Sequence, residues 1–176
     1  MSGEEGRPAV FLDRDGTLIE DVGYPSDPAH VRLVDGAVDA LAEFRRHGFA
    51  LVVISNQSGI GRGLVTPEQA DAVHRRFLQE LSSRGVDLDD VRYCPHAPDE
   101  RCACRKPAAE LLLAAARELR IDLSRSFMIG DSPVDAGAGR AAGCRTVGLG
   151  DGAVADADYV ATGWPDAVAH ILSTTP

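Results

Sequence analysis

Short runs of hydrophobic residues alternate along the chain with longer segments of helical periodicity. Five runs are continuously apolar and partly β-branched, which is typical of strands covered on both faces of a parallel sheet. These runs are 9–13, 50–55, 90–94, 126–131 and 144–149. The clearest helical segments are 36–47, 67–84, 107–120 and 133–142. We therefore predict an α/β protein, a three-layer sandwich around a parallel, Rossmann-like sheet.

The ends of the predicted helices carry recognisable signals. Thr66 precedes Pro67 and stands three residues before Gln69, which is the pattern of a capped helix start with proline in the first turn. Glycine follows three of the helical segments, where a helix C-terminus commonly needs it. These glycines are Gly48, Gly85 and Gly143.

The chain has the size and composition of one globular domain. It has 176 residues, 44% of them hydrophobic and 26% charged, and we expect a single domain over 1–176. The net charge of −9 argues against a nucleic-acid partner, whose phosphates need a basic surface. We find no signal peptide and no apolar stretch near the roughly 18 residues that span a bilayer. We therefore expect a cytoplasmic protein with no membrane partner, and in the cytoplasm clustered cysteines bind metal more often than they form disulfides.

Polar residues stand at or just beyond the ends of several predicted strands. They are Asp13, Asp15, Ser55, Asn56, Cys94 and Asp131. Because ligands of open α/β sheets bind beyond the carboxyl ends of the strands, we expect these residues to share one crevice. Asp13 and Asp15 precede Gly-Thr, which is also typical of an ordinary turn. Two such carboxylates repel each other unless a cation lies between them, and Asp131 could complete an oxygen site that suits Mg²⁺.

Four motifs at these positions resemble those of the haloacid dehalogenase (HAD) superfamily of phosphatases. They read Asp13-Arg14-Asp15-Gly16-Thr17, Ser55-Asn56-Gln57, Arg105-Lys106-Pro107 and Gly130-Asp131. Each motif alone has little specificity, but the four occur in the order of that family over nearly the whole chain, from about residue 9 to residue 148. The resemblance implies a HAD fold and phosphatase activity.

The resemblance also implies roles for the acidic residues. Asp13 would attack phosphorus and form an aspartyl-phosphate intermediate. Asp15 would protonate the leaving oxygen and later activate water, and an aspartate at this position favours hydrolysis. Asp13, Asp131 and the main-chain carbonyl of Asp15 would hold Mg²⁺.

Three further residues carry implied supporting roles. Ser55 would donate a hydrogen bond to the phosphoryl oxygens, and Lys106 would offset their charge. Asp135 resembles a carboxylate that orients groups of the site from behind. A solvated acid in the first turn of a helix is an equally good interpretation of Asp135.

Three of the four cysteines and one histidine crowd into a short polar loop, 94–104. The residues are Cys94, His96, Cys102 and Cys104. Three thiolates and one imidazole form a complete tetrahedral zinc set, which indicates a structural Zn²⁺ site. A disulfide pair or three free thiols are the alternatives. The last cysteine precedes Arg105 and Lys106, so the metal would fix two cations beside the crevice. Cys144 stands apart, as a small core residue.

The zinc loop makes the chain similar to two groups of HAD phosphatases without a large cap domain. These are the D-glycero-D-manno-heptose-1,7-bisphosphate 7-phosphatases and the histidinol-phosphate phosphatases. The segments 21–28 and 55–63 resemble the heptose group, which implies a set of substrate contacts. This set is Asp21, Val22, Gly23, Tyr24, Ser55, Asn56, Gln57, Ser58, Arg105, Lys106 and Ser132. The heptose group often has Thr in place of Ser55 and Lys in place of Ser132, and the second difference weakens one expected contact.

We therefore expect a monomeric, Mg²⁺-dependent phosphatase that acts on a small sugar phosphate and contains structural Zn²⁺. The expected reaction is removal of the 7-phosphate of D-glycero-D-manno-heptose 1,7-bisphosphate. Two alternatives stay open at this point: hydrolysis of histidinol phosphate, and a catalytically inactive, zinc-stabilised binding protein on the same fold.

Overall fold

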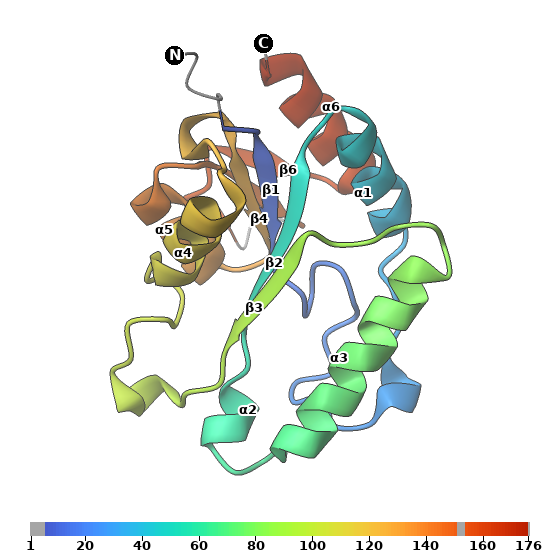
Figure 1. Cartoon of the computed structure of the whole chain (residues 1–176), viewed down its shortest axis with the longest axis vertical. Coiled ribbons are helices and arrows are strands. Elements are labelled where there is room, and N and C mark those ends of the chain that lie inside the picture. Colours follow the sequence, from blue (N-terminus) through green and yellow to red (C-terminus); the bar gives the residue numbers. More distant parts are fainter. Residues whose placement is uncertain (1–5, 151–153, 176) are drawn as a thin grey trace.

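A computed structural model describes residues 6–150 and 154–175 of the chain. Its centre is one sheet of parallel strands in the order β3-β2-β1-β4-β5-β6 (Figure 1). The strands are β1 (Ala9–Leu12), β2 (Ala50–Asn56), β3 (Asp90–Cys94), β4 (Phe127–Gly130), β5 (Arg145–Leu149) and β6 (Tyr159–Ala161). The predicted parallel sheet is confirmed, and β1 lies in its middle.

Helices cover both faces of the sheet. The longer ones are α1 (Ala37–Arg46), α3 (Pro67–Ser82), α4 (Glu110–Leu119), α5 (Pro133–Ala142) and α6 (Trp164–Thr174), and α2 (Ser58–Gly61) is a single turn after β2. In Figure 1, α4 and α5 lie on one side of the strands, and α1, α3 and α6 lie on the other. The predicted three-layer sandwich is therefore confirmed.

Two hydrophobic cores follow from the alternation of side chains along the strands. Val10 and Leu12 of β1 pack with Phe44 of α1 and Phe77 of α3. Ala9 and Phe11, the other two residues of β1, face the second core. Their helical partners there are the small or medium side chains Leu112, Ala115 and Ala138 of α4 and α5. Because both faces of β1 are fully buried, the strand reads as a continuous apolar run.

The structure contains elements at the C-terminal end that were not predicted, and one predicted helix begins three residues later than expected. Strand β6 and helix α6 were not predicted, and β6 has only three residues. Helix α4 begins at Glu110 rather than at Pro107, because Ala108 N–H first closes a turn on the carbonyl of Arg105 at 2.9 Å. Residues 107–109, between Lys106 and the helix, thus form a turn and a bend rather than the first turn of the helix.

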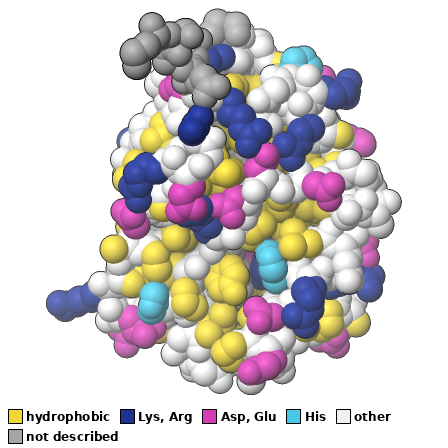
Figure 2. Space-filling view, viewed as in Figure 1, with side chains coloured by type: hydrophobic (Ala, Val, Ile, Leu, Met, Phe, Trp, Pro, Cys, Tyr) yellow, Lys and Arg dark blue, Asp and Glu magenta, His cyan; other side chains and the backbone are white. Residues whose placement is uncertain are grey.

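None of the helices in 6–150 and 154–175 is long and apolar enough to cross a bilayer. On the face drawn in Figure 2, basic and acidic side chains are intermixed rather than segregated.

The predicted start of α3 is confirmed as a reciprocal cap. Thr66 Oγ1 accepts from Gln69 N–H at 3.2 Å, and Gln69 Oε1 accepts from Thr66 N–H at 2.9 Å. Together these bonds satisfy donors that the first helical turn would otherwise leave without a partner.

We predict that Thr66→Ala lowers the free energy of unfolding by about 1 kcal/mol, because it removes the acceptor for Gln69 N–H. Urea unfolding followed by circular dichroism measures this loss. Thr66→Ser, which keeps the hydroxyl, should remain within about 0.5 kcal/mol of the parent protein. Equal losses in the two variants would show that the cap is not the cause.

Candidate active site and metal centre

The predicted crevice lies beyond the carboxyl ends of β1, β2 and β4. It is a cavity of about 240 Å³. Its lining includes most of the predicted site residues, namely Asp13, Asp15, Asp21, Gly23, Tyr24, Asn56, Gln57, Ser58, Lys106, Asp131 and Ser132. Four predicted residues do not line it: Val22 is exposed, Ser55 and Cys94 are buried, and Arg105 is half-buried on the zinc loop.

Lys106 lies at the centre of the buried part of the site. Its Nζ donates to Asp13 Oδ1 at 2.8 Å, to Asp135 Oδ1 at 2.6 Å and to the carbonyl of Ile54 at 2.7 Å. Only 2% of Lys106 is exposed. All three N–H donors of the ammonium group therefore have acceptors, as a buried charge requires.

The buried charges shift each other's protonation. Burial, with the nearby carboxylate of Asp135, raises the pKa of Asp13 to about 7, although Lys106 acts in the opposite direction. Burial works to lower the pKa of Lys106, but Asp13 and Asp135 outweigh it and hold that pKa above its ordinary value. A divalent cation beside Asp13 would favour its ionised, nucleophilic form.

Asp13, Asp131 and Asp135 form the carboxylate group that suits a metal ion. One oxygen of each lies within 4.8 Å of the others. Burial, followed by the charge of Asp135, raises the pKa of Asp131. When all three are ionised, the single ammonium of Lys106 leaves two negative charges, which one divalent cation would neutralise. Hard oxygen ligands of this kind fit Mg²⁺.

Asp135 supports this carboxylate group through hydrogen bonds to Lys106 and Ser132. Its Oδ1 accepts from Lys106, and its Oδ2 accepts from Ser132 N–H at 3.2 Å and from Ser132 O–H at 2.8 Å. It is only 1% exposed. The sequence left open whether Asp135 orients the site or is a solvated helix residue. The burial and the bond to Lys106 favour the orienting role.

Two glycines allow the carboxylates to approach the backbone. Gly16 has φ +82°, and a Cβ there would lie 2.1 Å from Asp131 Oδ2. A Cβ on Gly130 would lie 2.3 Å from Asp135 Cγ. Any larger residue at either position would push an acid out of the group, so these glycines are part of the site.

The carboxylate of Asp15 turns to a different set of partners. Arg14 Nε and Nη2 donate to its two oxygens at 3.2 Å each, and Gln57 Nε2 donates to Oδ2 at 2.8 Å. The same Gln57 nitrogen lies 2.7 Å from Ser55 Oγ, which accepts from it. Arg14 had no predicted role. The only signal for it was a cation placed between two acids of the first motif.

Asn56 fixes the main chain at Lys106. Its Oδ1 accepts from Lys106 N–H at 3.0 Å, and its Nδ2 donates to the Lys106 carbonyl at 3.2 Å. The predicted contact of Asn56 is with substrate. In the structure its amide is already paired at both ends with the chain that carries the buried ammonium.

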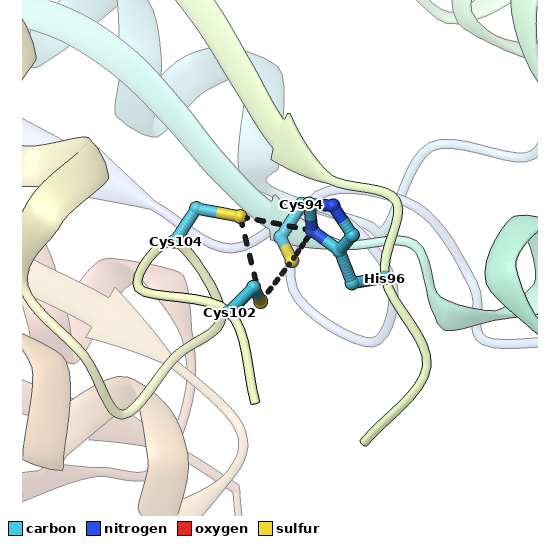
Figure 3. A group of neighbouring side chains, drawn as sticks. All are labelled: Cys94, His96, Cys102 and Cys104. Carbon is cyan, nitrogen blue, oxygen red and sulfur yellow. Dashed lines mark hydrogen bonds between the residues drawn. The ribbon is translucent and has the colours of Figure 1, made fainter. Parts of the chain in front are cut away.

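Figure 3 shows that the four predicted zinc residues converge on one point. Cys94 Sγ lies 3.4 Å from both His96 Nδ1 and Cys102 Sγ. Cys104 Sγ lies 3.3 Å from His96 Nδ1 and 3.6 Å from Cys102 Sγ. A tetrahedral zinc site has edges of about 3.6–3.8 Å between such ligands. All four cysteines are free, so neither a disulfide nor separated thiols describes the cluster.

Metal binding would also change the charge of the cluster. Burial raises the pKa of Cys94 to about 12, so this thiol stays protonated at neutral pH without a metal. A zinc ligand must be a thiolate, and binding therefore displaces the proton. The residues fit Zn²⁺ in number, chemistry and position.

The cysteine and histidine loop is bonded to the crevice wall. Gln57 N–H donates to the carbonyl of Cys94 at 2.7 Å, and Gly61 N–H donates to that of Pro95 at 2.8 Å. Gly61 permits this approach, because a Cβ there would lie 2.4 Å from Ala97 N. At the far end of the loop, Arg105 Nη1 is buried without a hydrogen-bond partner among the described residues. An anionic ligand would satisfy it.

Comparisons with known proteins agree with this geometry. Residues 103–175 match the HAD-hydrolase-like family model. A D-glycero-beta-D-manno-heptose-1,7-bisphosphate 7-phosphatase of Yersinia pestis is 45% identical over 146 residues, which are 79% of this chain and 78% of that protein. The protein of the same name from Escherichia coli K12 is 43% identical, over 79% of this chain and 76% of its own.

Solved structures extend the likeness to the fold. A D,D-heptose 1,7-bisphosphate phosphatase of B. bronchiseptica, complexed with magnesium and phosphate, has a TM-score of 0.85 at 28% identity over 94% of this chain and 98% of its own. A putative HAD-like phosphatase of Mesorhizobium loti has a TM-score of 0.86 at 34% identity, over 100% of this chain and 92% of its own.

We predict that the purified protein contains about one zinc ion per chain, because the four-ligand set is closed. Cys102→Ala should lose most of this zinc, since three ligands remain. Elemental analysis of the desalted protein measures the metal.

The matched control is Cys144→Ala, which removes the cysteine that lies outside the cluster and should keep the full zinc content. Zinc-free protein that retains reduced thiols, or equal metal loss in both variants, would contradict the assignment.

Proposed function

Because the chain belongs to the D-glycero-beta-D-manno-heptose-1,7-bisphosphate 7-phosphatase family of HAD-like hydrolases, we propose that it removes the 7-phosphate of D-glycero-D-manno-heptose 1,7-bisphosphate. The observation that carries this proposal is the buried contact of Lys106 with Asp13 at the carboxyl end of β1, beside Asp131. This arrangement supplies a nucleophile, a fixed cation and a place for Mg²⁺ in one cavity.

In the proposed reaction Asp13 is the nucleophile. One of its oxygens attacks phosphorus, and the bond from phosphorus to the sugar oxygen breaks. Asp15, which lines the same cavity, gives its proton to the departing oxygen. Asp15 then takes a proton from water as the water attacks the aspartyl phosphate, and inorganic phosphate leaves.

The surrounding groups stabilise charge. Lys106 is bonded to Asp13, and its charge would stabilise the phosphoryl oxygens as they gain negative charge. Ser55 Oγ accepts a hydrogen bond from Gln57 Nε2 at 2.7 Å, and its own hydroxyl proton would be donated to a phosphoryl oxygen. Held by Asp13, Asp131 and the main-chain carbonyl of Asp15, Mg²⁺ would neutralise the anionic nucleophile and the phosphate during their approach.

Substrate selection involves the more exposed side of the cavity. Asp21, Gly23 and Tyr24 lie on the segment after β1, and Ser58 and Ser132 lie at the starts of α2 and α5. We assign these residues, with the neighbouring Val22, to the sugar. Arg105 would receive the second phosphate, because its Nη1 is buried without a hydrogen-bond partner among the described residues and a guanidinium can grip phosphate with two N–H bonds.

We propose that Zn²⁺, bound by Cys94, His96, Cys102 and Cys104, holds this arginine in place. The last ligand is adjacent to Arg105 in the sequence. The loop has little apolar material of its own, so metal binding would supply the free energy that orders it.

We predict that Asp13→Asn abolishes turnover, because an amide cannot act as the nucleophile while the side-chain volume is unchanged. Phosphate release from the heptose bisphosphate in the presence of Mg²⁺ measures this. The exposed Asp39→Asn of α1 serves as control and should keep full activity. Ordinary turnover by the Asp13→Asn protein would exclude the covalent mechanism.

Arg105→Ala tests the bisphosphate assignment. We predict that KM for heptose 1,7-bisphosphate rises about tenfold or more, while kcat changes little, because the lost contact is to the second phosphate and not to the reacting one. With heptose 7-phosphate, which lacks the second phosphate, KM should hardly change. Arg117→Ala, an exposed arginine paired with Glu110 on α4, is the control.

Histidinol phosphate serves as the competing substrate in the same assay. It presents cationic and imidazole groups where Arg105 would receive an anion, so its kcat/KM should be much lower than that of the heptose bisphosphate. A higher kcat/KM for histidinol phosphate would replace the heptose assignment and leave the phosphatase chemistry standing.

A further inference from the structure

Arg14 is a buried cation placed between the two carboxylates of the first motif. It is only 4% exposed, and it does not belong to the cavity lining, whereas its neighbours Asp13 and Asp15 do. Its side chain reaches one carboxylate, that of Asp15. We propose that Arg14 is a positioning residue, which holds Asp15 in the orientation needed for proton transfer without touching the substrate. This inference rests on the function proposed above.

The contact fixes the plane of the carboxylate and not merely its charge. Arg14 Nε donates to Oδ2 and Nη2 donates to Oδ1, each at 3.2 Å. Two N–H groups in a rigid fork set both the position and the rotation of the carboxylate, whereas an ammonium group provides a single point of charge. A residue that transfers a proton needs this control, because small errors in its direction slow the reaction.

The main chain at Arg14 is held as firmly as the side chain. Its carbonyl accepts from Thr17, Leu18 and Ile19 N–H at 3.3, 2.9 and 3.0 Å, and Gly16 N–H donates to the carbonyl of Ile19 at 2.8 Å. The guanidinium therefore extends from a turn whose main chain is fixed, and its two hydrogen bonds in turn fix the position of Asp15.

The surroundings of the guanidinium are those of a group that acts on Asp15 and not on the substrate. Burial, followed by the charge of Arg14, lowers the pKa of His74 of α3. Gln57 also donates to Asp15, with Nε2 at 2.8 Å from Oδ2. Asp15 is thus held between a buried cation and an amide, and its side chain remains 16% exposed toward the cavity.

If Arg14 served only as a structural counter-charge, its substitution would have a different consequence. Its loss would weaken the fold or distort the whole site, and kcat/KM would fall equally for all substrates. Losing an orienting group for Asp15 matters only where the leaving oxygen needs a proton. Alkyl phosphates need one because alkoxides are poor leaving groups, whereas p-nitrophenolate departs without one.

The test compares kcat/KM for these two substrate types in Arg14→Lys and Arg14→Met. With the heptose bisphosphate we expect kcat/KM to fall about 10- to 100-fold. With p-nitrophenyl phosphate the fall should stay below about threefold, because expulsion of the leaving group no longer depends on Asp15. Both substrates are measured on one preparation, so any inactive fraction cancels from the ratio. Equal losses on the two substrates would overturn the proposal.

A double-mutant cycle gives a second readout. In an Asp15→Asn background, Arg14→Lys should change kcat/KM for the alkyl phosphate by less than about threefold, because the residue through which Arg14 acts is already disabled. A full further loss in that background would show that Arg14 acts independently of Asp15. Arg45→Lys, at an arginine paired with Asp89 at 2.7 Å outside the cavity, is the control and should behave like the parent protein.

Failure of the proposed substrate is separable from failure of this inference. The parent protein reports directly whether heptose bisphosphate is hydrolysed. If it prefers another alkyl phosphate, the same comparison is made with that compound, and the selective loss expected for Arg14→Lys is unchanged.

Discussion

The arrangement of the site depends on one buried ion group, in which the ammonium of Lys106 is held by Asp13 and Asp135. Each charge comes from a different part of the chain: the end of β1, the segment before α4, and the first turn of α5. Removing one partner of such a buried group typically costs about 3–5 kcal/mol, because the others lose their compensation. The group therefore couples correct folding to correct assembly of the site, and it holds the nucleophile before any ligand arrives.

The position of Lys106 is in turn set by groups that take no part in the chemistry. Asn56 pairs with its main chain on one side, and the cysteine and histidine loop ends two residues before it. A polar loop of this length cannot bury enough apolar surface to order itself. A metal at its four converging ligands would supply the missing free energy, which is a physical reason for a structural metal beside a phosphatase site.

The place of Lys106 in the site was predicted only from the resemblance to HAD phosphatases. Periodicity and strand-end position were sufficient to predict the sheet, its two helical layers and the convergence of Asp13 and Asp131. These features depend on burial and on where parallel strands end, and both leave a mark on the sequence. The partners of Arg14, Asn56 and Gln57 were not predictable, because they depend on rotamers that only the packed structure selects. Strand β6 was not predicted, for a different reason. Its three residues are too few to show a period, and the strand is fixed by pairing with β5.

The site therefore has two parts with different tolerance to change. The reacting groups are buried and joined by hydrogen bonds to several elements, so a substitution at Asp13, Lys106 or Asp135 disturbs them all. Most of the residues assigned to the sugar lie on the segment after β1, where Val22 is 52% and Tyr24 45% exposed. Ser132 is bonded to the buried Asp135, whereas the side chains of this exposed segment can change while the phosphoryl chemistry persists. Selectivity among sugar phosphates is thus adjustable in this fold without rebuilding the catalytic charges.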